Sequence, residues 1–218
     1  GAAPGSWAMR TSASSATPRQ AGTSWQSIAN QNITMSLLYL PKMVMAKDQF
    51  VISAMIALSI YEVLNELLPN HLVEIKWPND IMVDHQKICG VLIENTIQGA
   101  YIQNCIIGIG LNVLQDDFEN LPFATSMYLK GYLGNIETVI KRLLETIEKN
   151  YLFLKTGKNK EIFDQYHEVL MGKGQSLKFS DLHSEFSGII QKVAPDGRLA
   201  ILTDQGTKCF YHKEVVFL

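Results

Sequence analysis

Residues 76–95, KWPNDIMVDHQKICGVLIEN, predict a β-hairpin. Apolar residues run into Pro78, which has no backbone N–H for strand pairing, and resume after it as a strand up to Val83. The polar residues 84–86 supply the turn, and the apolar run 88–93 forms the second strand. A hairpin needs polar residues only at its exposed turn, yet this one carries charged and amide side chains beside its apolar strand residues. Burial of such groups is costly unless they are paired or used, so the hairpin is a candidate functional site.

The polar residues in question are Lys76, Asn79, Asp80 and Lys87. Gly90 lies three residues after Lys87, inside the second strand, where glycine usually marks a bulge or a close approach of backbone or ligand. This combination indicates a lysine that is held over a surface to which another molecule comes very near.

The composition is that of an ordinary folded chain. The 218 residues suit one medium domain, or one domain with a small appendage, and 47% hydrophobic with 18% charged residues allows a buried core. The formal net charge of −2 gives no overall basic field for nucleic acid. Three scattered cysteines without metal-ligand spacing indicate a reducing compartment. We expect no apolar stretch to approach the roughly 20 residues of a membrane helix, and therefore a cytoplasmic protein.

Three blocks of the sequence resemble the biotin–protein ligases, which join biotin to a lysine of carboxylase carrier domains through a biotinyl-adenylate. The blocks are residues 76–80 (KWPND), 87–94 (KICGVLIE) and 108–112 (GIGLN). Their order and spacing carry the resemblance, which runs from about Gln20 to Leu218. It implies an α+β catalytic domain over residues 20–170, with a mixed sheet and packed helices as in biotin and lipoate ligases. It also implies a small SH3-like β-barrel over residues 171–218.

Residues 1–19 differ from the rest, because they contain no Asp, Glu or Lys but two of the four arginines. We expect them to be an atypical or disordered leader. In the family, a loop of the form Gln-x-x-Gly-Arg-Gly-x-x-Gly-x-x-Trp folds over biotin and the adenylate phosphate. Residues 20–25 match the end of that loop, whereas residues 17–19 (TPR) stand where Gly-Arg-Gly is expected. A non-catalytic biotin-binding homologue is therefore an alternative to an active enzyme.

Periodicity predicts the remaining elements. An apolar stripe at helical spacing covers residues 48–68, with Asp48 as the expected N-cap. A long amphipathic helix is predicted to begin at Asn135, and a short one covers residues 161–170. From Met171 the period changes to two, which predicts four strands at residues 175–179, 185–193, 197–203 and 207–217.

The resemblance implies a two-step reaction. The carboxylate of biotin attacks the α-phosphate of ATP with loss of pyrophosphate, and the amine of the carrier lysine then attacks the mixed anhydride. Both reactants of the first step are anions, so the site must supply positive charge and exclude water. Lys87 is the expected catalytic residue, bridging a carboxylate oxygen and an α-phosphate oxygen. It is also assigned to biotin binding, together with Gly90, Gln20 and Gly22.

ATP binding is assigned by the same resemblance to Trp25, Lys76, Asn79, Asp80 and Asn112. Trp25 would offer a flat surface to adenine, and such stacking is worth roughly 1–3 kcal/mol. Asp80 would hold the phosphates through Mg²⁺, which takes one or two carboxylates plus phosphate oxygens. Lys76 either adds positive charge or pairs with a neighbouring glutamate. Asn112 either hydrogen-bonds the nucleotide or orders its own loop.

The expected partners are biotin, ATP and the biotin carboxyl carrier domain of a carboxylase, with no DNA and no membrane. Regulatory relatives place a helix-turn-helix ahead of the catalytic domain, and we expect the type without it. A homodimer stays open, because family members pair through sheet edges but no dimer stripe is visible. Lipoate–protein ligase or transferase is the alternative within the same fold. Residues 76–78 and Trp25 favour biotin, and the Gly-Gly-Gly loop of the lipoate enzymes is absent.

Overall fold

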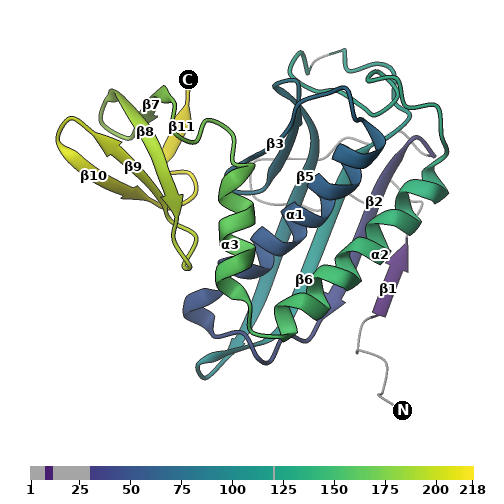
Figure 1. The fold of residues 1–218 in the computed structure, drawn as a ribbon, viewed down its shortest axis with the longest axis horizontal. Helices are drawn as coiled ribbons and strands as arrows, with labels where there is room; N and C mark the ends of the chain where they lie inside the picture. Colours follow the sequence, from purple (N-terminus) through teal and green to yellow (C-terminus); the bar gives the residue numbers. More distant parts are fainter. Residues whose placement is uncertain (1–7, 12–29, 120) are drawn as a thin grey trace.

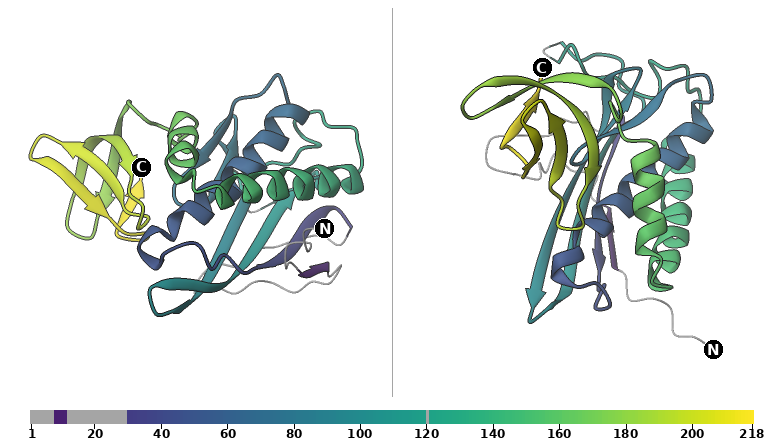
Figure 2. Two further views of the ribbon diagram at one scale, coloured as in Figure 1. Left: turned by 60° about the horizontal axis from the view of Figure 1, so that its bottom comes forward. Right: turned by 60° about the vertical axis from the view of Figure 1, so that its left-hand side comes forward.

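The computed structural model of the protein describes residues 8–11, 30–119 and 121–218, which form two sheets and three α-helices (Figure 1). The larger sheet has six strands in the order β1-β2-β6-β5-β4-β3, and the smaller has five in the order β10-β9-β8-β7-β11. The helices lie on one face of the larger sheet, and the smaller sheet stands at one end of the molecule beside α3 (Figure 2). The predicted α+β class with packed helices is confirmed.

The larger sheet is antiparallel at every strand pair formed by the described residues, so the expectation of a mixed sheet was wrong. Strands β3 to β6 follow one another through short turns, and short turns join antiparallel neighbours only. The predicted hairpin is confirmed as β4 and β5. The strands of this sheet are β1 (Ala8–Thr11), β2 (Asn32–Tyr39), β3 (Val73–Lys76), β4 (Asp80–Val83), β5 (Gln86–Gln98) and β6 (Tyr101–Asn112).

Helix α1 (Phe50–Leu67) forms the core of the molecule and is buried on most of its circumference, because it lies between the sheet and helices α2 and α3 (Figure 2). The helical run Ala46–Leu67 is 22 residues long and apolar enough to cross a membrane. The expectation that no stretch approaches this length was therefore wrong. However, 67% of its most apolar window is buried inside the protein, as is typical of a core helix.

The helix ends differ in how they are capped. Helix α1 follows a 3₁₀ turn (Ala46–Asp48) and has Gln49 at its N-cap, so the prediction of Asp48 as the cap was wrong. Helix α2 (Ile136–Lys155) begins as predicted after Asn135, whose side chain accepts a hydrogen bond of 2.8 Å from the backbone N–H of Thr138. Such a cap satisfies one of the unpaired N–H groups of the first turn. Helix α3 (Asn159–Glu168) is the short third helix.

Side-chain alternation gives the larger sheet an inner face under the helices and an outer face opposite it. In β2 the buried side chains are those of Ile33, Met35, Leu37 and Tyr39. The rings of Tyr39 and Tyr151 of α2 meet edge to face at 4.6 Å between centroids. The partners of these four residues on β6 are buried as well. The alternate positions of β2, β6, β5 and β4 therefore point to the outer face.

The smaller sheet is open: strands β7 to β10 form a meander and β11 returns to pair with β7, so that its edges are β10 and β11. The sequence predicted one strand over residues 207–217, but β10 ends at Phe210 and β11 begins at Val215, with a turn at residues 211–214 between them. The strands are β7 (Ser176–Asp181), β8 (Glu185–Val193), β9 (Leu199–Thr203), β10 (Gly206–Phe210) and β11 (Val215–Phe217).

The smaller sheet is joined to the rest of the protein through its β8–β9 turn. The indole N–H of Trp77 donates to the carbonyl of Gly197 at 2.9 Å, and the N–H of Phe50 donates to the carbonyl of Pro195 at 3.1 Å. Gly197 has φ of 93°, and a Cβ there would come within 2.9 Å of the ring of Phe50. Glycine is therefore required both by the backbone conformation and by the close contact.

Strand β1 lies within residues 1–19, the segment expected to be a leader. Residues Ala8–Thr11 pair antiparallel with residues 35–38 of β2 and form the edge of the larger sheet. The described part of this segment therefore extends the sheet by one strand.

Replacing Leu64 by alanine tests the importance of α1 for stability. Leu64 is fully buried, so the substitution should lower the free energy of unfolding by about 2–5 kcal/mol through lost burial and the cavity left behind. Leu133→Ala is the matched control, because that leucine is 88% exposed and should cost about 0.5 kcal/mol or less. Urea unfolding followed by circular dichroism measures both, and equal losses would contradict the assignment of α1 as the core.

Candidate functional site

A β-bulge brings the predicted catalytic lysine onto the outer face of the sheet. The register between β4 and β5 shifts by one residue after Ile81, so that Ile88 is the extra residue of β5. Ile88 and Cys89 are both buried, although they are neighbours in the strand. In regular alternation, Lys87 and Gly90 would point to opposite faces, because they are three residues apart. The bulge places both of them on the outer face.

Lys87 and Asp80 form an ion pair on that face. The ammonium nitrogen of Lys87 lies 2.6 Å from Oδ1 of Asp80, with the two side chains 40% and 26% exposed. Because the two groups are this close and partly shielded from water, the attraction between them is stronger than in a fully exposed ion pair. Two of the residues predicted from the sequence are therefore in direct contact.

A glycine floor, consisting of Gly90 and Gly110, lies beside this ion pair. Asp80 is the register partner of Gly90, Gly90 pairs with Gly110, and Gly110 pairs with Thr34 of β2. The row therefore crosses four strands of the outer face and carries no side chain on its two central strands, where Gly110 is buried and Gly90 is partly exposed.

The far end of the row carries an unsatisfied polar atom. The hydroxyl oxygen of Thr34 is buried and has no hydrogen-bond partner among the described residues. Buried polar groups are almost always hydrogen-bonded in native proteins, and exceptions often mark sites completed by another molecule. The arrangement of a cation, a bare floor and a free hydroxyl fits a small polar ligand that carries negative charge at one end.

Asn79 and Lys76 occupy positions next to the ion pair but have partners of their own. The side-chain amide of Asn79 donates to the carbonyl of Val91, and the N–H of Val91 donates to the carbonyl of Asn79 at 3.0 Å. Asn79 thus fastens the β3–β4 turn to β5. The ammonium group of Lys76 lies 5.3 Å from the centre of the Phe217 ring, a distance suited to a cation–π contact.

Asn112 is buried and orders the segment that follows β6. Its side-chain amide donates to the carbonyl of Thr125 at 2.9 Å, and its own carbonyl accepts from the N–H of Met127 at 3.2 Å. The same segment runs beside the lysine: the N–H of Lys87 donates to the carbonyl of Phe123 at 2.7 Å. Two roles were predicted for Asn112, binding of the nucleotide and ordering of its own loop. The hydrogen bonds that Asn112 forms with the described residues are those of the second role.

Sequence reasoning missed Phe123, which lies in this segment with 76% of its surface exposed. Its backbone carbonyl accepts from the N–H of Lys87, so an exposed aromatic residue lies next to the strand that carries the lysine. Residues 121–127 show no hydrophobic period, so the position of Phe123 could be found only from the hydrogen bonds to β5.

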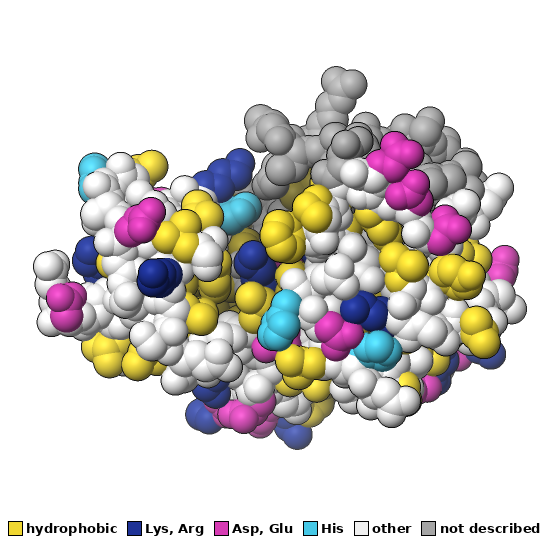
Figure 3. All heavy atoms as spheres, turned by 90° about the horizontal axis from the view of Figure 1, so that it is seen from above, with side chains coloured by type: hydrophobic (Ala, Val, Ile, Leu, Met, Phe, Trp, Pro, Cys, Tyr) yellow, Lys and Arg dark blue, Asp and Glu magenta, His cyan; other side chains and the backbone are white. Residues whose placement is uncertain are grey.

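Three of the predicted binding residues, Gln20, Gly22 and Trp25, lie outside the described residues, as do the divergent residues 17–19. The structure therefore brings together Lys87, Asp80 and Gly90 with Asn79 and Lys76 nearby. Figure 3 views the molecule from above and shows Lys, Arg and His side chains on the face between the smaller part of the molecule on the left and the larger part on the right.

The turn between β4 and β5 holds the lysine strand in place. Asp84 and His85 both adopt left-handed conformations, with φ of 48° and 64°, as in the tight turns preferred by hairpins. The carboxylate of Asp84 accepts hydrogen bonds from His71 at 2.7 Å and from the ammonium group of Lys130 at 2.9 Å. Burial opposes ionisation of Asp84, but these two hydrogen bonds, a third from the backbone N–H of Leu72 and the charge of Lys130 together outweigh it and lower its pKa to about 2.

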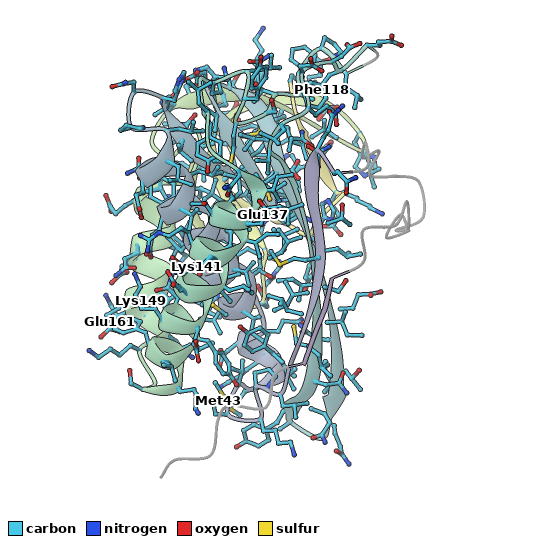
Figure 4. All side chains as sticks on the ribbon, turned by 90° about the vertical axis from the view of Figure 1, so that its right-hand side faces the viewer. Met43, Phe118, Glu137, Lys141, Lys149 and Glu161 are labelled. Carbon is cyan, nitrogen blue, oxygen red and sulfur yellow. The ribbon has the colours of Figure 1, made fainter. Side chains whose placement is uncertain are left out.

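A separate cavity of about 390 Å³ lies on the inner face, between β2 and α2. It has an apolar lining and charged side chains at its rim, and Figure 4 shows the molecule from this side with Glu137 and Lys141 labelled on α2. Burial raises the pKa of Tyr39, one of its lining residues, to about 12. None of the predicted site residues lines this cavity. Its lining consists of Leu37, Tyr39, Glu137, Ile140, Lys141, Leu144, Glu145 and Glu148.

Comparison with known sequences identifies relatives of this chain. Residues 16–112 match the model of the Biotin/lipoate A/B protein ligase family. Over 196 residues the chain is 29% identical to the bifunctional ligase/repressor BirA of Bacillus spizizenii, an alignment that covers 88% of this chain and 60% of BirA. The chain therefore spans about 60% of the length of that relative. A 63-residue segment, 28% of this chain and 26% of the relative, is 35% identical to the biotin–[acetyl-CoA-carboxylase] ligase of Paracoccus denitrificans.

Comparison with solved structures finds a biotin protein ligase with a similar fold. The structure resembles the biotin protein ligase of Aquifex aeolicus in complex with biotin and ATP, with a TM-score of 0.74 and 26% sequence identity. The match covers 90% of this chain and 82% of the Aquifex chain, so it includes both sheets.

Replacing Asp84 by asparagine tests the anchoring of the hairpin turn. Because the folded pKa of Asp84 lies below its usual value of 3.8, its ionised form stabilises the fold above about pH 4, and this contribution is lost as the pH falls toward about 2. D84N should therefore unfold at a lower urea concentration than the wild type at pH 7, and the gap should narrow as the pH falls from 4.5 to 3.

The matched control is Asp204→Asn in the exposed β9–β10 turn, which should leave the urea midpoint nearly unchanged across this range. A constant gap between D84N and the wild type from pH 7 to pH 3 would show that ionisation of Asp84 does not stabilise the turn.

Proposed function

We propose that this chain, a relative of the biotin protein ligases in sequence and in fold, is an ATP-dependent ligase that activates biotin as biotinyl-5′-AMP and transfers it to a lysine of a carrier domain. The observation that carries the proposal is the Lys87–Asp80 ion pair beside the glycine floor on the outer face. The relatives from Bacillus spizizenii and Paracoccus denitrificans are both named as ligases. The structure of the Aquifex relative was solved in complex with biotin and ATP.

Lys87 would act in the first step by holding two anions together. Its ammonium group would contact a carboxylate oxygen of biotin and a nonbridging oxygen of the α-phosphate, and so lower the repulsion between them. As the new bond forms and pyrophosphate leaves, negative charge shifts among oxygens that the lysine already faces. A lysine on a bulged strand is restricted by its backbone hydrogen bonds, which limits the reorganisation that this step requires.

The glycine floor would hold biotin. Gly90 and Gly110 carry no side chain that would keep a flat ring system from the backbone, and the hydroxyl of Thr34 would supply a hydrogen bond at the end away from Lys87. Gln20 and Gly22 stay assigned to biotin on the strength of the sequence resemblance. With its ring system over the glycine floor and one end at Thr34, biotin would have its carboxylate directed toward Lys87.

The nucleotide would lie toward the β3–β4 turn. Among the described residues, no group of three or more His, Cys, Asp and Glu side chains is placed to hold a metal ion by itself. Mg²⁺ commonly binds through one or two carboxylates and the phosphates of the nucleotide, and Asp80 fits that role. Mg²⁺ would neutralise part of the negative charge of the phosphates. Lys76, Asn79 and Asn112 would contribute to the nucleotide site, and the indole of Trp25 would stack on the adenine ring.

The second step needs no nucleophile from this chain, because the lysine amine of the carrier attacks the anhydride. We propose a biotin carboxyl carrier domain of a carboxylase as the protein substrate, a cytoplasmic location, and no binding of DNA. A homodimer is compatible with this proposal, since β1 and β3 are the edges of the larger sheet.

Residues 20–170 would form the ligase domain and residues 171–218 an SH3-like appendage, and within residues 1–19 the strand β1 would add to the sheet of the ligase domain. Five short antiparallel strands joined by tight turns support the SH3-like assignment, while the described strands leave the sheet open between β10 and β11. The hydrogen bond from Trp77 to Gly197 fastens this appendage to the strand that leads into the site.

Biotinylation of a purified carrier domain, with release of pyrophosphate, tests the function directly. Biotin, ATP and the carrier together should give a biotinylated product, and omission of any one of them should abolish it. Lipoylation in a parallel reaction with lipoate would support the lipoate ligase alternative instead. Binding of biotin without turnover would support a non-catalytic homologue.

Replacing Lys87 by alanine tests the assigned role of that side chain. The variant should form biotinyl-5′-AMP about 100- to 1,000-fold more slowly, because one donor aimed at the developing charge is lost. Its affinity for ATP should change much less. Lys141→Ala is the matched control, since that lysine is 76% exposed on α2. An unchanged rate of adenylation in K87A, measured by pyrophosphate release, would rule Lys87 out as the catalytic residue.

A further inference from the structure

Lys87 lies at a point of β5 that β6 does not reach, because the pairing between these strands begins only at Cys89. Ala124 occupies the position beside Lys87 instead and forms a parallel bridge with it. The N–H of Lys87 donates to the carbonyl of Phe123 at 2.7 Å, and the carbonyl of Lys87 accepts from the N–H of Thr125 at 2.9 Å. Both backbone polar groups of Lys87 are therefore bonded to one short stretch of chain.

This stretch belongs to a returning segment, residues 123–130, which is fixed by its own contacts. Ser126 and Met127 are fully buried. The hydroxyl oxygen of Ser126 accepts from the N–H of Leu129 at 3.2 Å, and the N–H of Lys130 donates to the carbonyls of Ser126 and Met127 at 3.2 and 3.1 Å. The segment thus ends in a tight turn, which sets the direction in which the side chain of Lys130 leaves the backbone.

The side chain of Lys130 reaches back to the hairpin that carries Lys87. Its ammonium group donates to the carboxylate of Asp84 at 2.9 Å and to the side-chain carbonyl of Gln86 at 3.0 Å. Only 12% of the Lys130 side chain is exposed, against 36–84% for the other lysines that form ion pairs among the described residues. Such a shielded cation is attracted to its partners more strongly than a lysine on the surface.

The returning segment and residues 84–87 therefore form a closed ring. Backbone hydrogen bonds at Lys87 close it at one end of the segment, and the ammonium group of Lys130 closes it at the other. Lys87 is the second residue of β5 and follows directly after the hairpin turn. Residues at such strand ends open easily unless other contacts hold them, so the ring limits the movement of Lys87.

We propose that Lys130 is a positioning residue for Lys87. Through Gln86 and the returning segment it fixes the start of β5, and with it the place from which the ammonium group of Lys87 reaches the reacting oxygens. The inference rests on the proposed function, in which Lys87 acts in the adenylation step. Lys130 itself contacts Asp84 and Gln86 rather than substrate. A misplacement of about 1 Å in a reacting group can cost about 100-fold in rate, so the loss of the ring should be visible in kinetics.

Lys130→Met removes the ammonium group and keeps an unbranched side chain of similar shape. The kcat of biotinyl-5′-AMP formation should fall about tenfold, while the KM values for biotin and ATP change by less than about twofold, because the binding side chains are intact. Lys130→Arg can donate to the same two acceptors and should recover at least about a third of the wild-type kcat. A rise in KM with unchanged kcat in K130M, or an Arg variant no faster than K130M, would overturn the proposal.

Lys149→Met is the matched control, because it also removes a lysine from an ion pair. The ammonium group of Lys149 lies 2.6 Å from the carboxylate of Glu62, between α2 and α1, and none of the residues assigned to the site contacts this pair. K149M should keep the wild-type kcat. An equal fall of kcat in K149M and K130M would show a general effect of lost ion pairs and would refute the assignment.

A double variant tests whether Lys130 acts through Lys87. If its only effect on the rate is to position that side chain, removal of Lys130 should cost little once Lys87 is already alanine. K87A and K87A/K130M should therefore form biotinyl-5′-AMP at rates within about twofold of each other. A further tenfold loss in the double variant would show that Lys130 acts independently of Lys87.

Hydrogen exchange separates a failure of this inference from a failure of the proposed function, because it needs no turnover. The backbone amide of Lys87 should exchange about tenfold faster in K130M than in the wild type, and amides of β9 should be unaffected. If the wild type forms no biotinyl-5′-AMP but this amide is deprotected in K130M, the proposed function is wrong and the link from Lys130 to Lys87 stands. If the wild type is active and K130M keeps the wild-type kcat, the inference is wrong and the proposed function stands.

Discussion

The bulge at Ile88 is the constraint on which the site depends. A strand side chain alternates strictly between two faces, and a spacing of three residues separates Lys87 from Gly90. One extra residue in β5 resolves the conflict, because it lets both residues face the outer side while Ile88 and Cys89 enter the core together. The ion pair with Asp80, the bare floor and the loop that covers the end of β5 all follow from this local change of register.

The same region also joins the two sheets. Trp77 donates to the carbonyl of Gly197 and packs against His212, and it is separated from Asp80 only by Pro78 and Asn79. The polypeptide that presents the proposed metal ligand is thus fixed from both sides, by Asn79 to β5 and by Trp77 to the C-terminal sheet. A site between rigid strands and a packed indole keeps its shape before substrate arrives, which favours electrostatic catalysis.

Local sequence signals predicted the parts of this structure that have clear periods or turn residues. The apolar stripe of α1, the Asn135 cap of α2 and the hairpin around Asp84 are of this kind. Gly90 indicated a bulge or a close approach in this strand, but the position of the bulge could not be predicted, because Ile88 is an ordinary strand residue and nothing marks it as the extra one. The turn at residues 211–214 was missed since it contains neither glycine nor proline, and its left-handed residue is a lysine. The role of Asn112 required the path of a distant loop, which only the three-dimensional fold reveals.

The central claim is that the outer face of the larger sheet, and not the cavity under α2, holds the reacting groups. A crystal structure with a non-hydrolysable analogue of biotinyl-5′-AMP tests it most directly. The account predicts the biotin ring over Gly90 and Gly110, with the group that links biotin to the adenosine within hydrogen-bond distance of the ammonium nitrogen of Lys87. Electron density for the analogue between β2 and α2, or anywhere on the helix-covered face, would contradict it.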